Sequence, residues 1–179
     1  MDKITFDVVG FDKLFERFQT LEKNAKEGVK DEFNASALKI QRDAKRLAPV
    51  NFGNLRNSIV LSQTGDTNNF LFTVSAKAKY APYVEFGTGG KVSVPNDYQS
   101  YAMQFKGQKN GTFKEMIAAI MLWVKRKGIG NGNDKSTAYL IARSILQKGL
   151  RPQPFMIPAF EQEKKNLLKR VKDKINAKS

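Results

Sequence analysis

The feature of the sequence that most constrains the fold is a long run of apolar residues at helical spacing between positions 25 and 47. Apolar side chains recur there every three or four residues, and this period places them on one face of a helix about 35 Å long. Pro49 disfavours helical geometry at Ala48, so the helix is expected to end near that point. The apolar face consists of Ala25, Val29, Phe33, Ala37, Ile40, Ala44 and Leu47.

Alternation of apolar and polar residues predicts short strands before and after this helix. They cover residues 4–9, 55–64 and 69–76, and "GDTN" at 65–68 predicts a hairpin turn between the last two. Residues 80–86 are predicted to form a further strand, at a sheet edge or strand start because Pro82 has no amide hydrogen. We therefore expect an α+β fold, in which a small antiparallel β-sheet packs against the long helix.

Four further helices are predicted, over residues 11–21, 113–128, 136–149 and 158–175. Gly128 is a stop signal, Ser136 or Thr137 is expected to cap the third of these helices, and Pro158 suits the first turn of the fourth. Residues 87–112 are rich in glycine and polar residues, and we interpret them as an extended loop. The chain is predicted to be a single domain over residues 1–179, with residues 113–149 as a helical insertion before the C-terminal helix.

The composition excludes several classes of site. Without cysteine or histidine, the chain has no disulfide, no thiolate or imidazole zinc site, and no Ser–His or Cys–His nucleophile. No stretch approaches the ~18 consecutive apolar residues of a membrane helix, and the charged start does not fit a secretory signal. The net charge of +14 favours an acidic partner, either nucleic acid or protein, although solubility alone is the plainer interpretation.

The stretch "YAPYVEFGTGG", residues 80–90, places one carboxylate, Glu85, among aromatic residues. Three interpretations are open: an ion pair inside the subunit or at a subunit interface, a solvated strand residue, or a catalytic acid. Catalysis would need a second acid, a base or a metal, and the nearest acid in sequence is Asp97, beyond the glycines. If residues 80–86 and 55–64 are neighbouring strands, Arg56 is the leading ion-pair partner of Glu85.

Three other segments allow a functional interpretation. "GTGG" matches neither a Walker motif nor the dinucleotide fingerprint, so we interpret its glycines as a flexible strand end rather than a phosphate loop. The C-terminal helix carries a basic face, which is either an ordinary solvated surface or a contact for an acidic partner. A solvated linker would not need the apolar residues of the 87–112 loop, so we expect them to contact a neighbouring subunit; they are Tyr98, Tyr101, Met103 and Phe105.

Three segments together resemble the head–tail joining, or tail-completion, proteins of long-tailed double-stranded DNA bacteriophages. They are "RLAPVNFGNLRNSI" (46–59), "YAPYVEFGTG" (80–89) and "RPQPFMIPAFEQEKKNLLKRVKDKI" (151–175). The residues that match the family pattern are Ala48, Pro49, Gly53, Leu55 and Arg56, then Tyr80, Ala81, Val84, Glu85, Gly87 and Thr88, and finally Pro154, Phe155, Pro158 and Ala159.

The resemblance implies a structural virion protein without enzymatic activity or cofactor. It implies a homo-oligomeric ring, of six copies or alternatively twelve, at the head–tail junction, assembled in the host cytoplasm. The partners would be the head connector and the tail tube, with packaged DNA only passing through the ring and no membrane involved. The expected contact residues between or within subunits are Arg56, Tyr80, Tyr83, Glu85, Phe86, Gly87 and Thr88, with Pro154, Phe155 and Pro158 docking the C-terminal helix.

Two rival functions stay open at this point. A basic nucleic-acid-binding protein explains the charge of +14 more directly and predicts binding that weakens steeply with salt. A metal-dependent nuclease would use acids such as Glu85 and Asp97 and would require a divalent cation.

Overall fold

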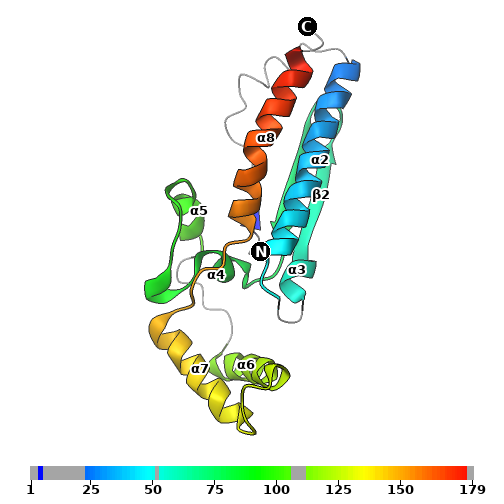
Figure 1. Cartoon of the computed structure of the whole chain (residues 1–179). Coiled ribbons are helices and arrows are strands. Elements are labelled where there is room, and N and C mark those ends of the chain that lie inside the picture. Colours follow the sequence, from blue (N-terminus) through cyan, green and yellow to red (C-terminus); the bar gives the residue numbers. More distant parts are fainter. Residues whose placement is uncertain (1–3, 6–22, 51–52, 106–111, 177–179) are drawn as a thin grey trace. The chain divides into compact units, whose positions relative to one another are not determined.

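The computed structural model describes residues 4–5, 23–50, 53–105 and 112–176 (Figure 1). The backbone gathers into two compact units. The first, here called the helix–sheet unit, combines Lys3–Ala78 with Pro154–Ser179. The second, here called the hairpin unit, comprises Lys79–Gln153. That the whole chain folds as a single domain stays a prediction.

The helix–sheet unit contains the long predicted helix and a small sheet. Helix α2 runs from Lys23 to Leu47, and the sheet has the order β1–β3–β2 with every pair antiparallel. The strands are β1 (Ile4–Thr5), β2 (Ile59–Gly65) and β3 (Phe70–Ala76). Helix α8 (Met156–Asn176) closes the unit. The structure therefore confirms the α+β fold class, with the sheet packed against the long helix.

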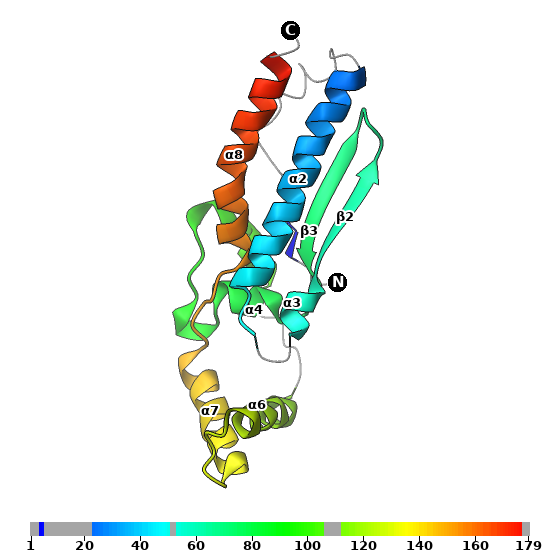
Figure 2. The same cartoon turned by 45° about the vertical axis from the view of Figure 1, so that its right-hand side comes forward.

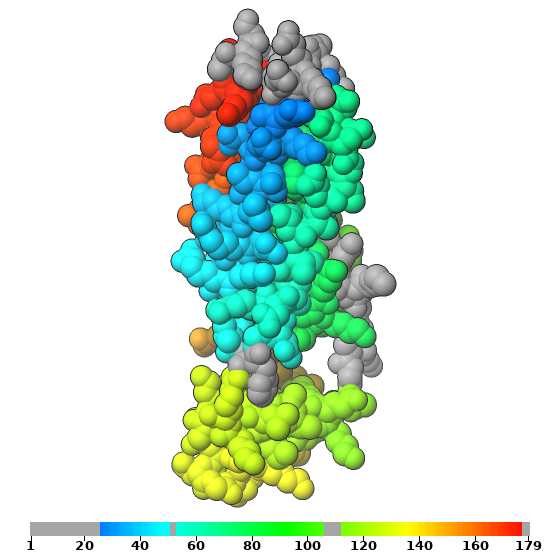
Figure 3. Space-filling model, turned by 90° about the vertical axis from the view of Figure 1, so that its right-hand side faces the viewer, coloured from blue at the N-terminus to red at the C-terminus, as the bar shows by residue number. Residues whose placement is uncertain are grey.

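Helix α2 is the centre of this unit because it contacts both α8 and the sheet. Figure 2 shows α2 between α8 and the β2–β3 ribbon, and the space-filling view shows α2 and the ribbon as one continuous surface (Figure 3). The apolar face of α2 meets that of α8 in a buried cluster, where the rings of Phe33 and Phe70 lie edge to face at 5.4 Å. Each fully buried side chain of this kind contributes about 1.5–3 kcal/mol. The cluster consists of Val29, Leu167, Val171 and Ile175.

The β2–β3 hairpin turns at the predicted position. Ile59 is opposite Ala76 at one end of the ladder, and Gly65 is opposite Phe70 at the other. The Asp66 carboxylate accepts hydrogen bonds from the amides of Asn68 and Asn69, at 2.7 and 2.9 Å. These bonds, first that of Asn69, hold the pKa of Asp66 below its ordinary value. This local side-chain bonding is what fixes the turn.

One strand prediction in this unit needs correction. Residues 55–58 do not begin a strand, because α3 (Asn54–Ser58) makes one helical turn before β2 starts at Ile59. The turn puts Leu55 and Ile59, four positions apart, on one buried side. Of the predicted strand at 4–9 only β1 is described, and the helix predicted at 11–21 lies outside the described residues.

The hairpin unit is helical wherever it is regular. It contains α4 (Ala81–Phe86), the short 3₁₀ turns η1 (Gly89–Lys91) and η2 (Asn96–Tyr98), and α5 (Gln99–Met103). Two longer helices follow, α6 (Phe113–Lys127) and α7 (Asp134–Lys148). The strand predicted at residues 80–86 is therefore wrong, and the described part of the predicted loop at 87–112 is not extended throughout.

The ends of α6 and α7 show how the sequence fixes this pair of helices. Thr112 accepts a hydrogen bond from the amide of Glu115, whose carboxylate accepts one from the amide of Thr112 in return. Gly128 ends α6 in the left-handed conformation, at φ 66°, as predicted. The predicted cap of α7 is wrong: the helix begins at Asp134, so Ser136 and Thr137 lie inside it. No described helix is long and apolar enough to cross a membrane.

Candidate functional site

The stretch at residues 80–90 forms helix α4 and the turn that follows it. The carbonyl of Tyr80 accepts hydrogen bonds from the amides of Tyr83 and Val84, at 3.1 and 3.2 Å, and so begins the helix. Pro82 fits there because the first turn of a helix needs no amide hydrogen. The buried residues lie at positions 81, 82, 85 and 86, which share one face of a helix but alternate sides on a strand. This burial pattern is the physical reason that the strand prediction fails.

Gly87 and Thr88 fasten the end of α4 to the segment that follows α7. The amide of Thr88 donates to the carbonyl of Leu150 at 3.0 Å, and the amide of Leu150 donates to the Thr88 hydroxyl at 2.8 Å. Gly87 and Gly149 adopt φ values of 77° and 75°. A Cβ on Gly87 would lie 2.7 Å from the Leu150 carbonyl oxygen, and one on Gly149 only 1.8 Å from that of Thr88. Gly87 and Gly149 therefore serve close backbone approach rather than flexibility.

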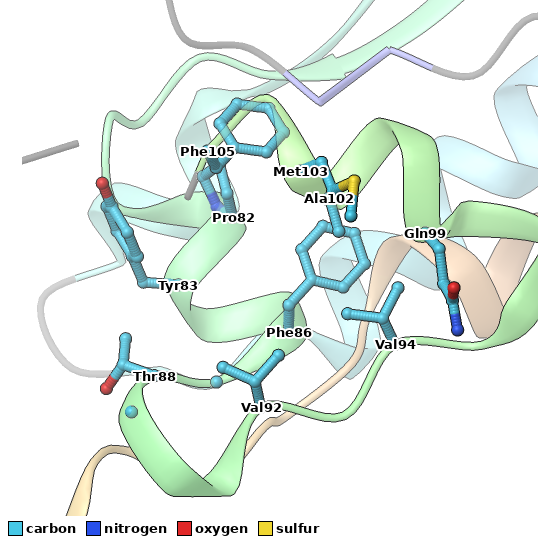
Figure 4. Close-up of a pocket in the computed structure, with 12 residues that line it drawn as sticks. Pro82, Tyr83, Phe86, Thr88, Val92, Val94, Gln99, Ala102, Met103 and Phe105 are labelled. Atoms are coloured by element: carbon cyan, nitrogen blue, oxygen red, sulfur yellow. The ribbon is translucent and has the colours of Figure 1, made fainter. Parts of the chain in front are cut away.

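An apolar pocket opens beside α4 and is formed entirely within the hairpin unit. Its volume is about 810 Å³. Figure 4 shows side chains from α4, from the segment after η1 and from α5 gathered around it. Polar groups are few, namely those of Tyr83, Thr88 and Gln99. The lining consists of Pro82, Tyr83, Phe86, Gly87, Thr88, Gly89, Val92, Val94, Gln99, Ala102, Met103 and Phe105.

Aromatic rings fix one wall of this pocket. The ring of Tyr101 lies 6.4 Å from that of Phe86 and 5.4 Å from that of Phe105, and both pairs are edge to face. Phe105 is buried, whereas Met103 is 67% exposed at the rim. The arrangement suits apolar side chains of another segment, because a flexible, polarisable methionine adapts to varied partners.

The structure brings together six of the residues predicted as contacts: Tyr83, Phe86, Gly87, Thr88, Met103 and Phe105 line the pocket. Tyr101 packs behind this wall, and Tyr98 is half-buried in η2 without lining the pocket. Tyr80 stands at the start of α4, where partial burial raises the pKa of its phenol. That any of these residues contacts a neighbouring subunit stays a prediction.

The structure removes the reason for which Arg56 was predicted to pair with Glu85. Both residues lie in helices, Arg56 in α3 and Glu85 in α4, so they do not face each other from neighbouring strands. The Arg56 Nε donates to the carbonyl of Lys45 at 2.9 Å. Glu85 is buried, at 1% exposure, on the inner face of α4. The pairing itself stays a prediction.

The residues expected to dock the C-terminal helix have unequal environments. Phe155 is fully buried, directly before α8, whereas Pro154 is exposed. Pro158 is half-buried at the third position of α8, which agrees with its expected place in the first turn. Phe155 therefore anchors the start of the helix, and Pro154 is available on the surface.

A buried polar cluster between α2 and α8 was not foreseen from the sequence. Glu163, at 1% exposure, accepts hydrogen bonds from Ser36 at 2.8 Å, from Arg170 at 2.6 Å and from Lys39. Arg170 also binds Glu32, at 2.9 Å. Burial opposes the charged form of Glu163, but these hydrogen bonds outweigh it and hold its pKa below the ordinary value.

A signal for Glu163 was nonetheless present. It lies on the apolar stripe of α8, three positions after Phe160 and four before Leu167, where a carboxylate must find partners. Six pocket residues that the sequence did not indicate have no such signal, because they come together only through the packing of separate short segments. They are Pro82, Gly89, Val92, Val94, Gln99 and Ala102.

The acids that a nuclease would need lie in different settings. Glu85 is buried in α4, and Asp97 is exposed in the first turn of η2. Among the described residues, no group of three or more His, Cys, Asp or Glu side chains is arranged to hold a metal ion.

Comparison with known proteins links this geometry to one family. No curated protein and no solved structure matches the chain. Residues 12–87, however, match a family model described as "Bacteriophage HK97-gp10, putative tail-component". The matched range includes α2, the β2–β3 hairpin and α4, and it ends at Gly87, which lines the pocket. The resemblance to a phage assembly family is confirmed for this range: residues 12–87 are similar to a bacteriophage tail component.

Proposed function

We propose that the chain is a structural tail or neck protein of a bacteriophage. In this proposal it forms a homo-oligomeric ring at the head–tail junction and joins the tail tube to the head connector. The single observation that carries the proposal is the family match over residues 12–87, which includes α4, the helix that forms one side of the pocket. It has neither catalytic activity nor a cofactor, and it assembles in the host cytoplasm.

A ring requires two different complementary faces on each subunit. The pocket beside α4 is a suitable first face, because it is apolar and has the exposed side chain of Met103 at its rim. The segment before α8, with Pro154 exposed, is a suitable second face. We expect six copies rather than twelve, since tail tubes have sixfold symmetry, and a lumen through which packaged DNA passes.

The segment from Gly87 to Thr112 is the part of the subunit that we expect to change on assembly. In its described residues, Tyr101 and Phe105 already pack together, but Met103 is largely exposed. We propose that a neighbouring subunit covers this rim. Amide hydrogen exchange around Met103 should then be fast in the free subunit and slow in the ring, whereas strong protection around Met103 in the free subunit would contradict the idea.

Glu85 is proposed as a structural ion-pair or hydrogen-bond residue, within the subunit or across to its neighbour, with Arg56 as the leading partner. Its burial is the supporting observation, since a buried carboxylate needs partners. A double-mutant cycle of Glu85→Gln and Arg56→Gln measures the coupling directly. Additive effects would exclude Arg56 as the partner.

Imaging of the virion tests the ring. Electron microscopy of purified particles should show this protein at the neck with rotational symmetry. Particles carrying Met103→Glu, which puts a charge at the pocket rim, should have heads and tails that fail to join. Gln104→Glu is the matched control, because it adds the same charge one residue away at an exposed position outside the lining.

The outcomes of this experiment separate two claims. If the protein is absent from the neck, or present without rotational symmetry, the ring proposal fails. If Met103→Glu particles join heads to tails as the wild type does, the ring stands but the pocket is not one of its contact faces.

Nucleic-acid binding is a second candidate, favoured by one observation. Lys165, Lys169 and Lys172 are exposed at four- and three-residue spacing, so they lie along one face of α8. Other basic residues of α8 are already engaged, since Arg170 and Lys174 contact Glu32. A gel-shift assay at two salt concentrations tests this: binding that weakens steeply with salt and disappears when the three lysines become Gln would support it.

A further inference from the structure

The helices α6 and α7 leave an unusual amount of apolar surface uncovered. Of the fourteen large apolar side chains exposed in the described part of the chain, seven lie between residues 113 and 150. Leu140 and Leu146 of α7 are 61% and 64% exposed. Surface of this kind, concentrated on one structural element, marks an interaction site more often than scattered single residues do.

The two helices bury little against each other. Ten of the fifteen residues of α6 are apolar, yet only Val124 is buried, and α7 buries only Ala138 and Ala142. The rings of Phe113 and Tyr139 meet edge to face at 5.9 Å, but neither is buried. A helix that is apolar on most sides normally lies in a protein interior. The pair therefore lacks a covering layer within the described part of the hairpin unit.

The unit that carries this apolar surface has a large excess of positive charge. The hairpin unit has twelve Lys or Arg residues against four Asp or Glu residues. Of those four acids, Glu85 is buried and Glu115 is bound in the capping box of α6. Lys125, Arg126 and Lys127 follow the apolar run "MIAAIMLWV" directly. A partner that covers the surface must bring negative charge next to apolar side chains.

The exposed residues of α7 indicate how apolar and acidic residues should be spaced in that partner. Tyr139, Arg143 and Leu146 are all exposed, at intervals of four and three residues, so they form one stripe along the helix. An apolar residue stands on each side of the arginine. A helix with an apolar stripe interrupted by one acid is complementary to this stripe, with Arg143 binding the acid.

We propose that α6 and α7 bind an acidic amphipathic helix of another protein. Leu140, Leu146 and Tyr139 supply the apolar contact, Arg143 binds an acid within the partner's apolar stripe, and the basic run at 125–127 attracts its acidic flank. This inference does not depend on the proposed ring, because the surface lies outside the matched residues 12–87.

Charge and residue type argue against other occupants. A second copy would bring another strongly basic unit to the same surface, and like charges in contact are unfavourable. Nucleic acid would use the lysines and arginines but not the exposed leucines. A membrane-surface helix carries its basic residues along its polar face, whereas those at the end of α6 follow an uncharged run of nine residues.

The binding test uses the full chain and a designed peptide. The peptide has about 18 residues, with Leu at helical spacing, one Glu inside the Leu stripe and Glu elsewhere on the surface. Trp123, the sole tryptophan, lies half-buried in α6 and reports binding by its fluorescence. A peptide of the same composition in scrambled order is the control ligand and should not bind.

Exposed residues provide matched protein variants that keep the fold intact. Leu140→Gln with Leu146→Gln should weaken binding about tenfold or more, whereas Leu71→Gln, at an exposed position of β3, should not. Replacing Lys125, Arg126 and Lys127 by Gln should weaken binding and reduce its salt dependence. The same change at Lys165, Lys169 and Lys172, which removes equal charge from α8, should have little effect.

A charge exchange tests the orientation of the partner. Arg143→Glu should weaken binding of the peptide about tenfold, and a peptide with Lys in place of its central Glu should restore binding to this variant alone. Equal loss for both peptides would overturn the role of Arg143.

Other results would contradict an acidic amphipathic helix as the partner. The inference fails if the peptide does not bind. It also fails if the variant with Leu140→Gln and Leu146→Gln binds the peptide as tightly as the wild type does. It also fails if those two leucines are instead required for self-association in sedimentation, for binding a DNA duplex, or for binding vesicles of anionic phospholipid. The ring could still be seen at the neck in each of these cases, so failure here is distinct from failure of the proposed function.

Discussion

The long helices of the helix–sheet unit and those of the hairpin unit handle their apolar residues in opposite ways. In the first unit, α2 and α8 bury a continuous apolar stripe. In the second, α6 and α7 bury only small side chains and leave Leu140 and Leu146 on the surface. The helix–sheet unit has the properties of a scaffold and the hairpin unit those of a surface made for contact.

This difference shows that the two units depend on different interactions for their stability and their geometry. The scaffold derives its stability from area removed from water and from satisfied polar groups. The hairpin unit relies on caps and on glycine-dependent backbone contacts, which fix geometry with little buried area. Substitutions of each kind should therefore have different consequences in the two units.

The largest effect is expected at Gly149 of the hairpin unit. In Gly149→Ala the new Cβ would lie 1.8 Å from the Thr88 carbonyl oxygen, at a φ of 75° that alanine disfavours. We expect a loss of about 4 kcal/mol or more in local stability. Hydrogen exchange at the amides of Thr88 and Leu150, which bond across this contact, measures it.

Gly90→Ala is the control for this prediction, because a Cβ on Gly90 has no atom within 4 Å. It should change exchange at those amides little. If Gly149→Ala also left exchange at those amides unchanged, the close approach of the two segments would not be what stabilises the turn after α4.

The next prediction compares the stability lost when one leucine in each unit is replaced by alanine. Leu167→Ala removes a buried side chain from the α2–α8 cluster and should cost about 2–5 kcal/mol in the free energy of unfolding. Leu140→Ala, at an exposed position of α7, should stay within about 0.5 kcal/mol. Urea denaturation followed by circular dichroism measures both. Equal losses would remove the contrast between scaffold and contact surface.

A smaller, pH-dependent effect is expected at Glu163. Its folded-state pKa lies below the ordinary 4.5, so its contribution to stability is complete above that value and is lost as the pH falls through the folded-state pKa. Glu163→Gln should cost about 1–3 kcal/mol at neutral pH, since Lys39 and Arg170 are partly exposed and can hydrate. The stability of the variant should depend less on pH below about 4.5.

Glu161→Gln serves as the control, because the pair that Glu161 forms with Lys164, at 4.0 Å, is partly exposed. It should change stability by no more than about 1 kcal/mol. Acid sensitivity that is identical in wild type and Glu163→Gln would show that other carboxylates dominate the response.

The smallest effect concerns the start of α6. Thr112→Ala removes the side chain that accepts from the Glu115 amide and should cost about 1 kcal/mol. Ser136→Ala, in the interior of α7, should cost less than about 0.5 kcal/mol. Hydrogen exchange in the first turn of each helix distinguishes them, and a larger effect at Ser136 would contradict the observed start of α7.

The sequence by itself determined the elements whose signals are local. The spacing of Val29, Phe33 and Ala37 specified α2 because the same helical period continues from residue 25 to residue 47. Residues 66–69 specified the hairpin turn because the bonds of Asp66 stay within the turn. Gly128 ended α6 for a similar reason, since it supplies the left-handed conformation by itself. The motifs also indicated the phage family that residues 12–87 match.

Only the tertiary structure decided the short segments and the site. Residues 80–86 are too few for periodicity to separate strand from helix, so burial of positions 81, 82, 85 and 86 made the choice. The pocket needs Gly87 and Thr88 to meet residues 149–152, more than sixty positions later, and Glu163 needs Ser36 and Lys39 from the opposite helix. Contacts of this kind depend on how distant segments pack, which no local pattern encodes.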